Sequence, residues 1–291
     1  MHPRDIFLAT LVAVIWGLGF VASRLALDEL PPTLMTTLRF TIAAVPCLFV
    51  RKPDVSWPLL IAISATLFLG QFLAQAFGIA HGVPVGLASV IVQSQALFTV
   101  AFAVIAFSEV PTRMQVIGIG VAAIGLLMIC GTVGYDFSVS AFAVLIISPI
   151  SFAVGNLLLR RASGVPMFDL FAWLCLAAAI PLFALTLVSN GPQPTWHALS
   201  QMSLTGLLCM LALGGISTSI AYWLWGRLLR DYPAAQVVPF ALLVPFVGAA
   251  ASSAVFGEKF GPLRLAGMIT VVGGIAVMLL SKRPQVLPKI A

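Results

Sequence analysis

The sequence places neutral polar and aromatic side chains inside long apolar segments, at spacings that put several of them on one helix face. Gln71 and Gln75 are four residues apart, so both point to the same side of a helix. Polar groups in hydrocarbon are costly unless satisfied, so such residues should face the interior of a helix bundle. A cavity of amides, hydroxyls and rings suits a neutral or zwitterionic solute with an apolar side chain. The candidate cavity residues are Trp16, Phe20, Gln71, Gln75, Ser89, Gln93, Ser151, Asn156, Ser219, Tyr222, Trp223 and Gln236.

These side chains have a second interpretation, in which they only hydrogen-bond neighbouring helices and hold the bundle together. For any single serine or asparagine in the set we favour this packing role. For Trp16, Gln71, Gln75 and Tyr222 the two interpretations stay equally open.

Arg39 is the only charge well inside an expected membrane-spanning helix. It lies about seven residues, or roughly 10 Å, below the nearer helix end. It either binds the carboxylate of a substrate, or makes an ion pair or snorkelling contact near Asp28 or Glu29. We favour the structural interpretation.

The acidic residues are informative by their positions, because all nine lie near helix ends or in loops. Proton-coupled transporters usually carry a carboxylate or histidine relay within the membrane. Only His81, near the end of a helix, approximates such a proton site. We therefore expect substrate-gradient-driven transport without a buried acidic proton relay.

The sequence predicts no catalytic residues, no metal site and no cofactor. His2, His81 and His197 are far apart, and the four cysteines have neither CxxC spacing nor a nearby histidine. A membrane-embedded enzyme is the main rival class, and it would need a catalytic cluster that we do not find. A channel would need rings of charge or a filter-like loop. The expected partners are a small-molecule substrate and the lipid bilayer, without nucleic acid; oligomeric state is open, and a monomer is compatible with the sequence.

Composition and patterning predict an all-α integral membrane protein. Hydrophobic residues make up 61% of the chain and charged residues 8%, whereas a soluble domain carries about 25% charged residues. A membrane-spanning helix needs about 20 mostly apolar residues. Glycine- and proline-rich breakers divide the apolar blocks into ten spans, at 5–27, 32–50, 57–79, 85–107, 113–132, 139–160, 168–188, 203–226, 235–256 and 262–281.

The basic residues predict how these spans are oriented, which also explains the net charge of +6 without a nucleic-acid partner. With a cytoplasmic N-terminus, the outer ends hold only Arg24, Lys259 and Arg264. The positive-inside rule therefore predicts a multi-pass protein of the cell (inner) membrane with both termini cytoplasmic. The inner segments then hold eleven basic residues: Arg4, Arg51, Lys52, Arg113, Arg160, Arg161, Arg227, Arg230, Lys282, Arg283 and Lys289.

The chain contains an internal repeat. A shift of 149 residues aligns Pro84 with Pro233, Glu109 with Glu258 and Gly125 with Gly274 without a gap. We therefore expect two five-helix repeats, 1–135 and 136–291, in one compact membrane unit. Because five is odd, the repeats must cross the membrane in opposite senses, an arrangement known in secondary transporters.

Four motifs in this repeat order carry a resemblance to a known family: Trp16-Gly17, Arg39, Ser108-Glu109 and Gly257-Glu258. With them the chain resembles the EamA-type ten-helix group of the drug/metabolite transporter superfamily over nearly its whole length. The second repeat departs from the pattern, with Ser151 in place of the tryptophan and Leu174 in place of the arginine.

The resemblance implies export of small metabolites, and the bacterial members that the sequence looks like export aromatic and neutral amino acids. A nucleotide-sugar or drug transporter of the same fold is the alternative. Several phosphates would call for several interior Lys or Arg, and only Arg39 qualifies.

Overall fold

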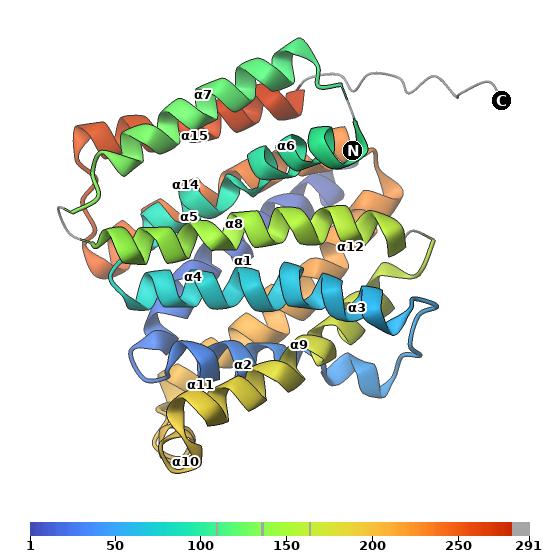
Figure 1. Cartoon of the computed structure of the whole chain (residues 1–291), viewed down its shortest axis with the longest axis vertical. Coiled ribbons are helices and arrows are strands. Elements are labelled where there is room, and N and C mark those ends of the chain that lie inside the picture. The colour runs from blue at the N-terminus through green and yellow to red at the C-terminus, as the bar shows by residue number, and fades with distance from the viewer. Residues whose placement is uncertain (109, 135–136, 163, 281–291) are drawn as a thin grey trace.

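The structure, a computed structural model, describes residues 1–108, 110–134, 137–162 and 164–280. Within these ranges all regular secondary structure is helical (Figure 1). Glu109 of the Ser108-Glu109 motif and the basic residues Lys282, Arg283 and Lys289 lie outside the described residues.

The first half of the chain forms five helical spans close to the predicted limits. The first span is one helix, whereas the third and fourth are built from several segments. They are α1 (Pro3–Leu27); α2 (Pro32–Ala43) with the 3₁₀ turn η1 (Val45–Leu48); α3 (Trp57–Ser64), the π-helical η2 (Ala65–Gly70) and α4 (Gln71–Ala80); α5 (Val85–Gln93) and α6 (Gln95–Phe107); and α7 (Arg113–Cys130).

The second half forms five more spans and one short additional helix, α10 (Pro192–Ser200). The spans are α8 (Val139–Leu159) with the 3₁₀ turn η3 (Arg160–Ala162); α9 (Met167–Asn190); α11 (Leu204–Leu211), the π-helical η4 (Ala212–Ile220) and α12 (Ala221–Asp231); α13 (Ala234–Val237), the 3₁₀ turn η5 (Val238–Leu242) and α14 (Leu243–Phe256); and α15 (Pro262–Leu280). In the described part of the chain, nine spans have the length and apolar composition to cross a membrane, and Pro32–Leu48 is a shorter apolar helix.

The helices lie roughly parallel in a bundle (Figure 1). At one edge α7 packs along α15, while α1 packs against α14, α4 against α8 and α2 against α9. The start of α1 and the end of α15 lie at the same end of the bundle, on the right in Figure 1, which we call the N-terminal end. Many large apolar side chains remain exposed, Phe49 by 83% and Val188 by 85% among them. Such a surface suits hydrocarbon rather than water.

Polar side chains fix several helix starts. Thr112 and Gln115 form a reciprocal capping box at the start of α7, with hydrogen bonds of 2.8 and 3.1 Å. At the opposite end of the bundle, the Glu258 carboxylate accepts hydrogen bonds from the backbone N–H groups of Val85 and Gly86, at 2.6 and 3.0 Å. Those N–H groups open α5 and have no intrahelical partner, so an anion stabilises them.

Two spans carry a π-helical segment at mid-length, η2 in the third span and η4 in the eighth. A side chain from another helix donates a hydrogen bond to a backbone carbonyl of each segment. The Ser151 hydroxyl donates to the Thr66 carbonyl at 2.7 Å, and the Trp16 indole N–H donates to the Ser217 carbonyl at 3.1 Å. Short π segments frequently mark functional sites, so the middle of these two spans is a candidate functional region.

Candidate functional site

Four aromatic rings meet beside η2 and η4, and Tyr222 is the ring that contacts the other three. Its centroid lies 5.4 Å from Trp16 of α1, 6.1 Å from Phe68 of η2 and 5.1 Å from Phe171 of α9. We call Trp16, Phe68, Phe171 and Tyr222 the ring cluster. It joins spans from both halves of the chain, so a solute bound against it would contact both.

Arg39 lies next to this cluster and is only 5% exposed. Its Nε donates a hydrogen bond to the Thr218 hydroxyl at 3.0 Å, and its guanidinium carbon sits 4.2 Å from the centroid of the Phe72 ring. Thr218 in turn donates to the Leu213 carbonyl at 2.8 Å. Arg39 is therefore held between α2, α4 and η4.

Arg39 does not form the ion pair that we expected near Asp28 or Glu29. Asp28 pairs with Arg24 one helical turn away, and Glu29 accepts hydrogen bonds from Ser203. Among the residues that the structure describes, no carboxylate forms an ion pair with Arg39. The expectation was wrong because the long side chain turns into the bundle, towards η4, rather than along α2 to the helix end.

A small cavity of about 20 Å³ adjoins the ring cluster. One water needs roughly 10–15 Å³, so the cavity is far too small for an amino acid in this conformation. Helices must therefore move apart before a solute of that size can enter. The walls of the small cavity include Phe68, Phe171, Cys175, Thr218, Ser219 and Tyr222, together with the half-exposed Trp223.

Six of the predicted cavity residues lie around this centre or are buried in α4. Trp16 and Tyr222 belong to the ring cluster, and Ser219 and Trp223 line the small cavity. Gln71 and Gln75 are 4% and 6% exposed. The Gln71 side-chain oxygen is buried and has no hydrogen-bond partner in the described part of the chain. That unsatisfied acceptor is unusual for a packing residue.

Other predicted residues make contacts between helices instead. On α5, the Ser89 hydroxyl lies 2.7 Å from the Gly86 carbonyl oxygen of the same helix and 3.5 Å from the Pro245 carbonyl oxygen of α14, and the Gln93 amide donates to the Ala241 carbonyl at 2.8 Å. On α8, Ser151 donates to η2, and the Asn156 amide donates to Thr99 of α6 at 3.5 Å. Such contacts can hold helices together, and the packing role of the serines and the asparagine stays a prediction.

Three further predicted residues are not members of the ring cluster. Phe20 is buried in the hydrophobic core between α1, α5 and α14. Gln236 is exposed on the short helix α13. His81 is exposed at the end of α4, with its Nδ1 2.8 Å from the Phe77 carbonyl oxygen and its ring stacked on Phe77.

The sequence did not single out Phe68, Phe72, Phe171, Cys175 or Thr218. The phenylalanines are indistinguishable in type from the many that face lipid. Phe68 and Phe72 do, however, flank Gln71 on the same span, so the aromatic side chains next to an interior amide were a usable signal.

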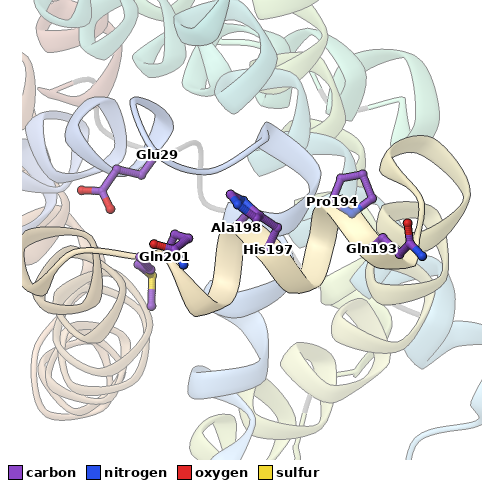
Figure 2. A pocket seen from close by; sticks show the side chains of 7 residues that line it. Glu29, Gln193, Pro194, His197, Ala198 and Gln201 are labelled. Atoms are coloured by element: carbon purple, nitrogen blue, oxygen red, sulfur yellow. The ribbon is translucent and has the colours of Figure 1, made fainter.

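A wider hollow of about 710 Å³ lies at the end of the bundle opposite the N-terminal end, between α10 and the loop that joins α1 to α2 (Figure 2). Glu29, Gln193, His197 and Gln201 contribute its polar lining. Hydrogen bonds from the Ser203 hydroxyl and then from the Ser203 backbone N–H hold the pKa of the Glu29 carboxyl below its ordinary value of 4.5. Glu29 thereby links the α1–α2 loop to the start of α11.

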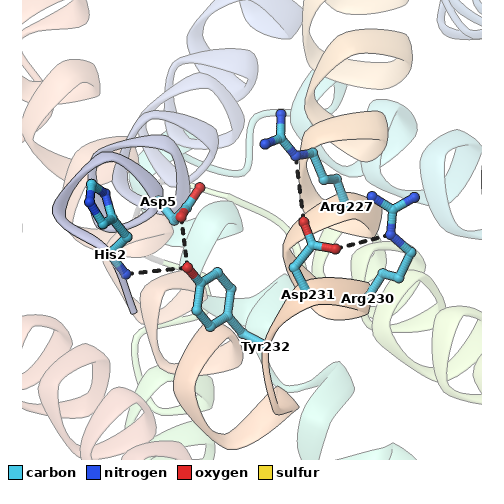
Figure 3. Close-up of polar contacts among 6 residues, drawn as sticks. All are labelled: His2, Asp5, Arg227, Arg230, Asp231 and Tyr232. Carbon is cyan, nitrogen blue, oxygen red and sulfur yellow. Dashed lines mark hydrogen bonds and ion pairs between the residues drawn. The ribbon is translucent and has the colours of Figure 1, made fainter.

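At the N-terminal end, Tyr232 joins two spans (Figure 3). Its hydroxyl donates to the Asp5 carboxylate at 2.7 Å and accepts from the His2 backbone N–H at 3.3 Å. The loop after α12 is thereby tied to the start of α1. The neighbouring ion pairs of Asp231 with Arg227 and Arg230 stay within α12.

Known proteins resemble this chain over nearly its whole length. A protein of Salmonella typhimurium named "Probable amino-acid metabolite efflux pump" is 34% identical over 95% of both chains, and the Escherichia coli K12 protein of the same name is 31% identical over 95% of both. A Streptantibioticus cattleyicolor protein named "Probable terminal-alkyne amino-acid exporter" is 25% identical over 96% of this chain and 94% of its own.

A solved structure shares the fold of this chain, and a family model matches most of its sequence. A solved crystal structure superposes with a TM-score of 0.67 over 95% of this chain and 96% of that one, at 19% identity, which shows a shared fold. The family described as "EamA-like transporter family" matches residues 4–131 and again residues 139–280. This multi-pass membrane protein, whose relatives are named as transporters rather than enzymes, belongs to the EamA-like transporter family.

Proposed function

We propose that this protein is an inner-membrane secondary transporter that exports neutral amino acids or their metabolites, including aromatic ones. The observation that carries the proposal is the ring cluster, which offers flat apolar faces beside interior amide and hydroxyl groups. Such a site accepts an apolar side chain and satisfies polar groups at one end. The names of the relatives point to the same class of solute.

A nucleotide-sugar substrate is less well supported by the charges. Recognition of two phosphates calls for several interior cations, and within the described spans Arg39 is the one arginine beside the ring cluster. The names of the relatives likewise favour a transporter over a membrane-embedded enzyme.

We further propose that transport proceeds by alternating access between two inverted repeats, 1–135 and 136–291. Three symmetric features support this. The family matches the chain twice, and the third span of each half carries a π-helical segment. The third span of each half also packs on the first span of the other half, α4 on α8 and η4 on α1. Alternating access commonly arises when two such repeats rock against each other around a fixed binding site.

The proposed orientation puts the N-terminal end in the cytoplasm. The described basic residues support it, because Arg51, Lys52, Arg113, Arg160 and Arg161 follow or precede spans at that end. The proposed mechanism uses no buried acidic proton relay. The described carboxylates lie near helix ends or in loops, as Glu29 and Glu258 do.

Transport by the purified protein in proteoliposomes tests the function. Vesicles preloaded with unlabelled phenylalanine should take up radiolabelled phenylalanine or leucine by saturable exchange, with and without a pH gradient. Absence of exchange for all neutral amino acids, together with exchange of a nucleotide sugar, would overturn the proposed substrate class. Strong stimulation by the gradient that persists in His81→Ala would overturn the mechanism without an acidic relay.

A further inference from the structure

The guanidinium of Arg39 is a buried charge for which the described part of the chain supplies only part of the expected hydrogen bonding. An arginine has five N–H donors. Only the Nε group has a hydrogen-bond acceptor among the described residues, the Thr218 hydroxyl at 3.0 Å. A charge that is 95% removed from solvent without a counter-ion is costly, and within a membrane such residues are usually functional.

The surroundings hold this guanidinium in a defined position. The Phe72 ring covers one face at 4.2 Å, a favourable cation–π distance. Thr218 is itself oriented by its hydrogen bond to the Leu213 carbonyl. The backbone of Arg39 also packs closely on η4, because a Cβ atom at Gly214 would lie 2.7 Å from the Arg39 carbonyl oxygen. The terminal nitrogens therefore stay available as a fixed, planar fork, the geometry that binds a carboxylate with two parallel hydrogen bonds.

The same contacts place this fork beside the ring cluster. Thr218, the partner of Arg39, lines the small cavity together with Tyr222 and Phe171. A carboxylate held by Arg39 would leave the rest of the solute against these rings. We propose that Arg39 is the carboxylate-binding residue of the central site, so that the transported solutes carry a free carboxylate and an apolar side chain. This inference rests on the proposed function, which it narrows to solutes with that group.

A comparison of ligands on the unmodified protein tests the inference without depending on a variant. Phenylalanine should raise the thermal unfolding midpoint by roughly 2–4 °C at saturating concentration, whereas phenylalaninamide, which lacks the carboxylate, should not. Equal stabilisation by the two ligands would overturn the inference.

Transport by variants then assigns the effect to Arg39. Arg39→Gln should lower kcat/KM for phenylalanine about 100-fold, and Arg39→Lys should lower it about tenfold, because lysine keeps the charge but loses the fork. Arg24→Gln is the matched control, since Arg24 is a half-exposed arginine paired with Asp28 within α1 and should leave transport unchanged. Thermal unfolding shows whether each variant folds.

The outcomes separate this inference from the proposed function. If Arg39→Gln folds and exchanges phenylalanine at the rate of the unmodified protein, the inference is overturned and the proposed function is unaffected. Arg39-dependent exchange of 3-phenylpropionate, without exchange of any amino acid, would support the carboxylate site and overturn the amino-acid function.

Discussion

Two loop carboxylates show how single residues hold this bundle together at the end opposite the N-terminal end. Glu29 uses both oxygens on Ser203, at the start of α11, and Glu258 uses both on the backbone of Val85 and Gly86, at the start of α5. In each case the loop and the helix belong to different halves of the chain. An anion at a helix start satisfies free N–H groups and interacts favourably with the helix dipole.

The Glu29 contact predicts a pH dependence of stability. Its pKa is lowered in the folded protein by the hydrogen bonds from Ser203, so its contribution is fully present above the unfolded pKa of about 4.5 and is lost as the pH falls through the lower folded value. Glu29→Gln should therefore unfold at a lower temperature than the unmodified protein near pH 7, and the gap should close at acid pH. Thermal unfolding in detergent between about pH 7 and pH 3 measures it. A gap that is constant over this range would contradict the prediction.

At this scale the sequence identified Trp16, Tyr222 and Arg39 as residues of interest because each is rare inside an apolar segment. It could not assign the partner of Arg39, because Thr218 is 179 positions away and the direction of a long side chain depends on packing. Phe68 and Phe171 could not be separated from lipid-facing phenylalanines, since type and hydropathy are the same on both surfaces.

At the scale of helices, the closest packing occurs between α7 and α15, where glycines bring the backbones together. A Cβ atom at Gly118 would lie 2.6 Å from the Gly274 carbonyl oxygen, whereas one at Gly120 would meet no atom within 4 Å. Small residues at helix contacts are the usual basis of close packing in membranes.

These two glycines give a matched test on one helix. Gly118→Ala should destabilise the protein by roughly 1–3 kcal/mol, because the extra methyl group forces the two backbones apart. Gly120→Ala should be neutral or stabilising by up to about 1 kcal/mol, because alanine favours the helix and nothing obstructs it. Thermal or denaturant unfolding of both variants measures the difference. Equal stability of the two would show that α7 and α15 are not held at this distance.

The helical spans of the described residues, nine long enough to cross a membrane and one shorter, were predictable because hydropathy and breakers report the length of each apolar segment. The irregular segments were not. Proline does not mark them, because η2 contains none, whereas Pro149 lies inside the continuous helix α8. The deciding partners of the π segments, the Ser151 hydroxyl and the Trp16 indole, come from other helices. Helix α10 was missed because two prolines and a glycine at its start read as a loop.

For the molecule as a whole, the central cavity is too small for a solute, so transport requires one end of the bundle to open. At the N-terminal end, α1 and α12 pack together around Ala9, Leu228 and Val237, and the Tyr232 hydroxyl adds the hydrogen bond to Asp5 (Figure 3). If the two halves separate here, that hydrogen bond must break. A hydrogen bond to a charged group contributes about 1.5–3 kcal/mol, which is enough to change the population of an open state about tenfold or more.

Tyr232→Phe should therefore favour the state that is open at the N-terminal end. Cys175 reports this opening, because it is 3% exposed, lines the small cavity and lies about 12 Å along α9 from its start at that end. In a background that lacks the other three cysteines, Tyr232→Phe should raise the rate of Cys175 alkylation by a maleimide about tenfold. Arg230→Ala, which removes an ion pair confined to α12, should leave the rate unchanged. Equal rates with and without Tyr232→Phe in that background would mean that the hydrogen bond to Asp5 does not hold this end closed.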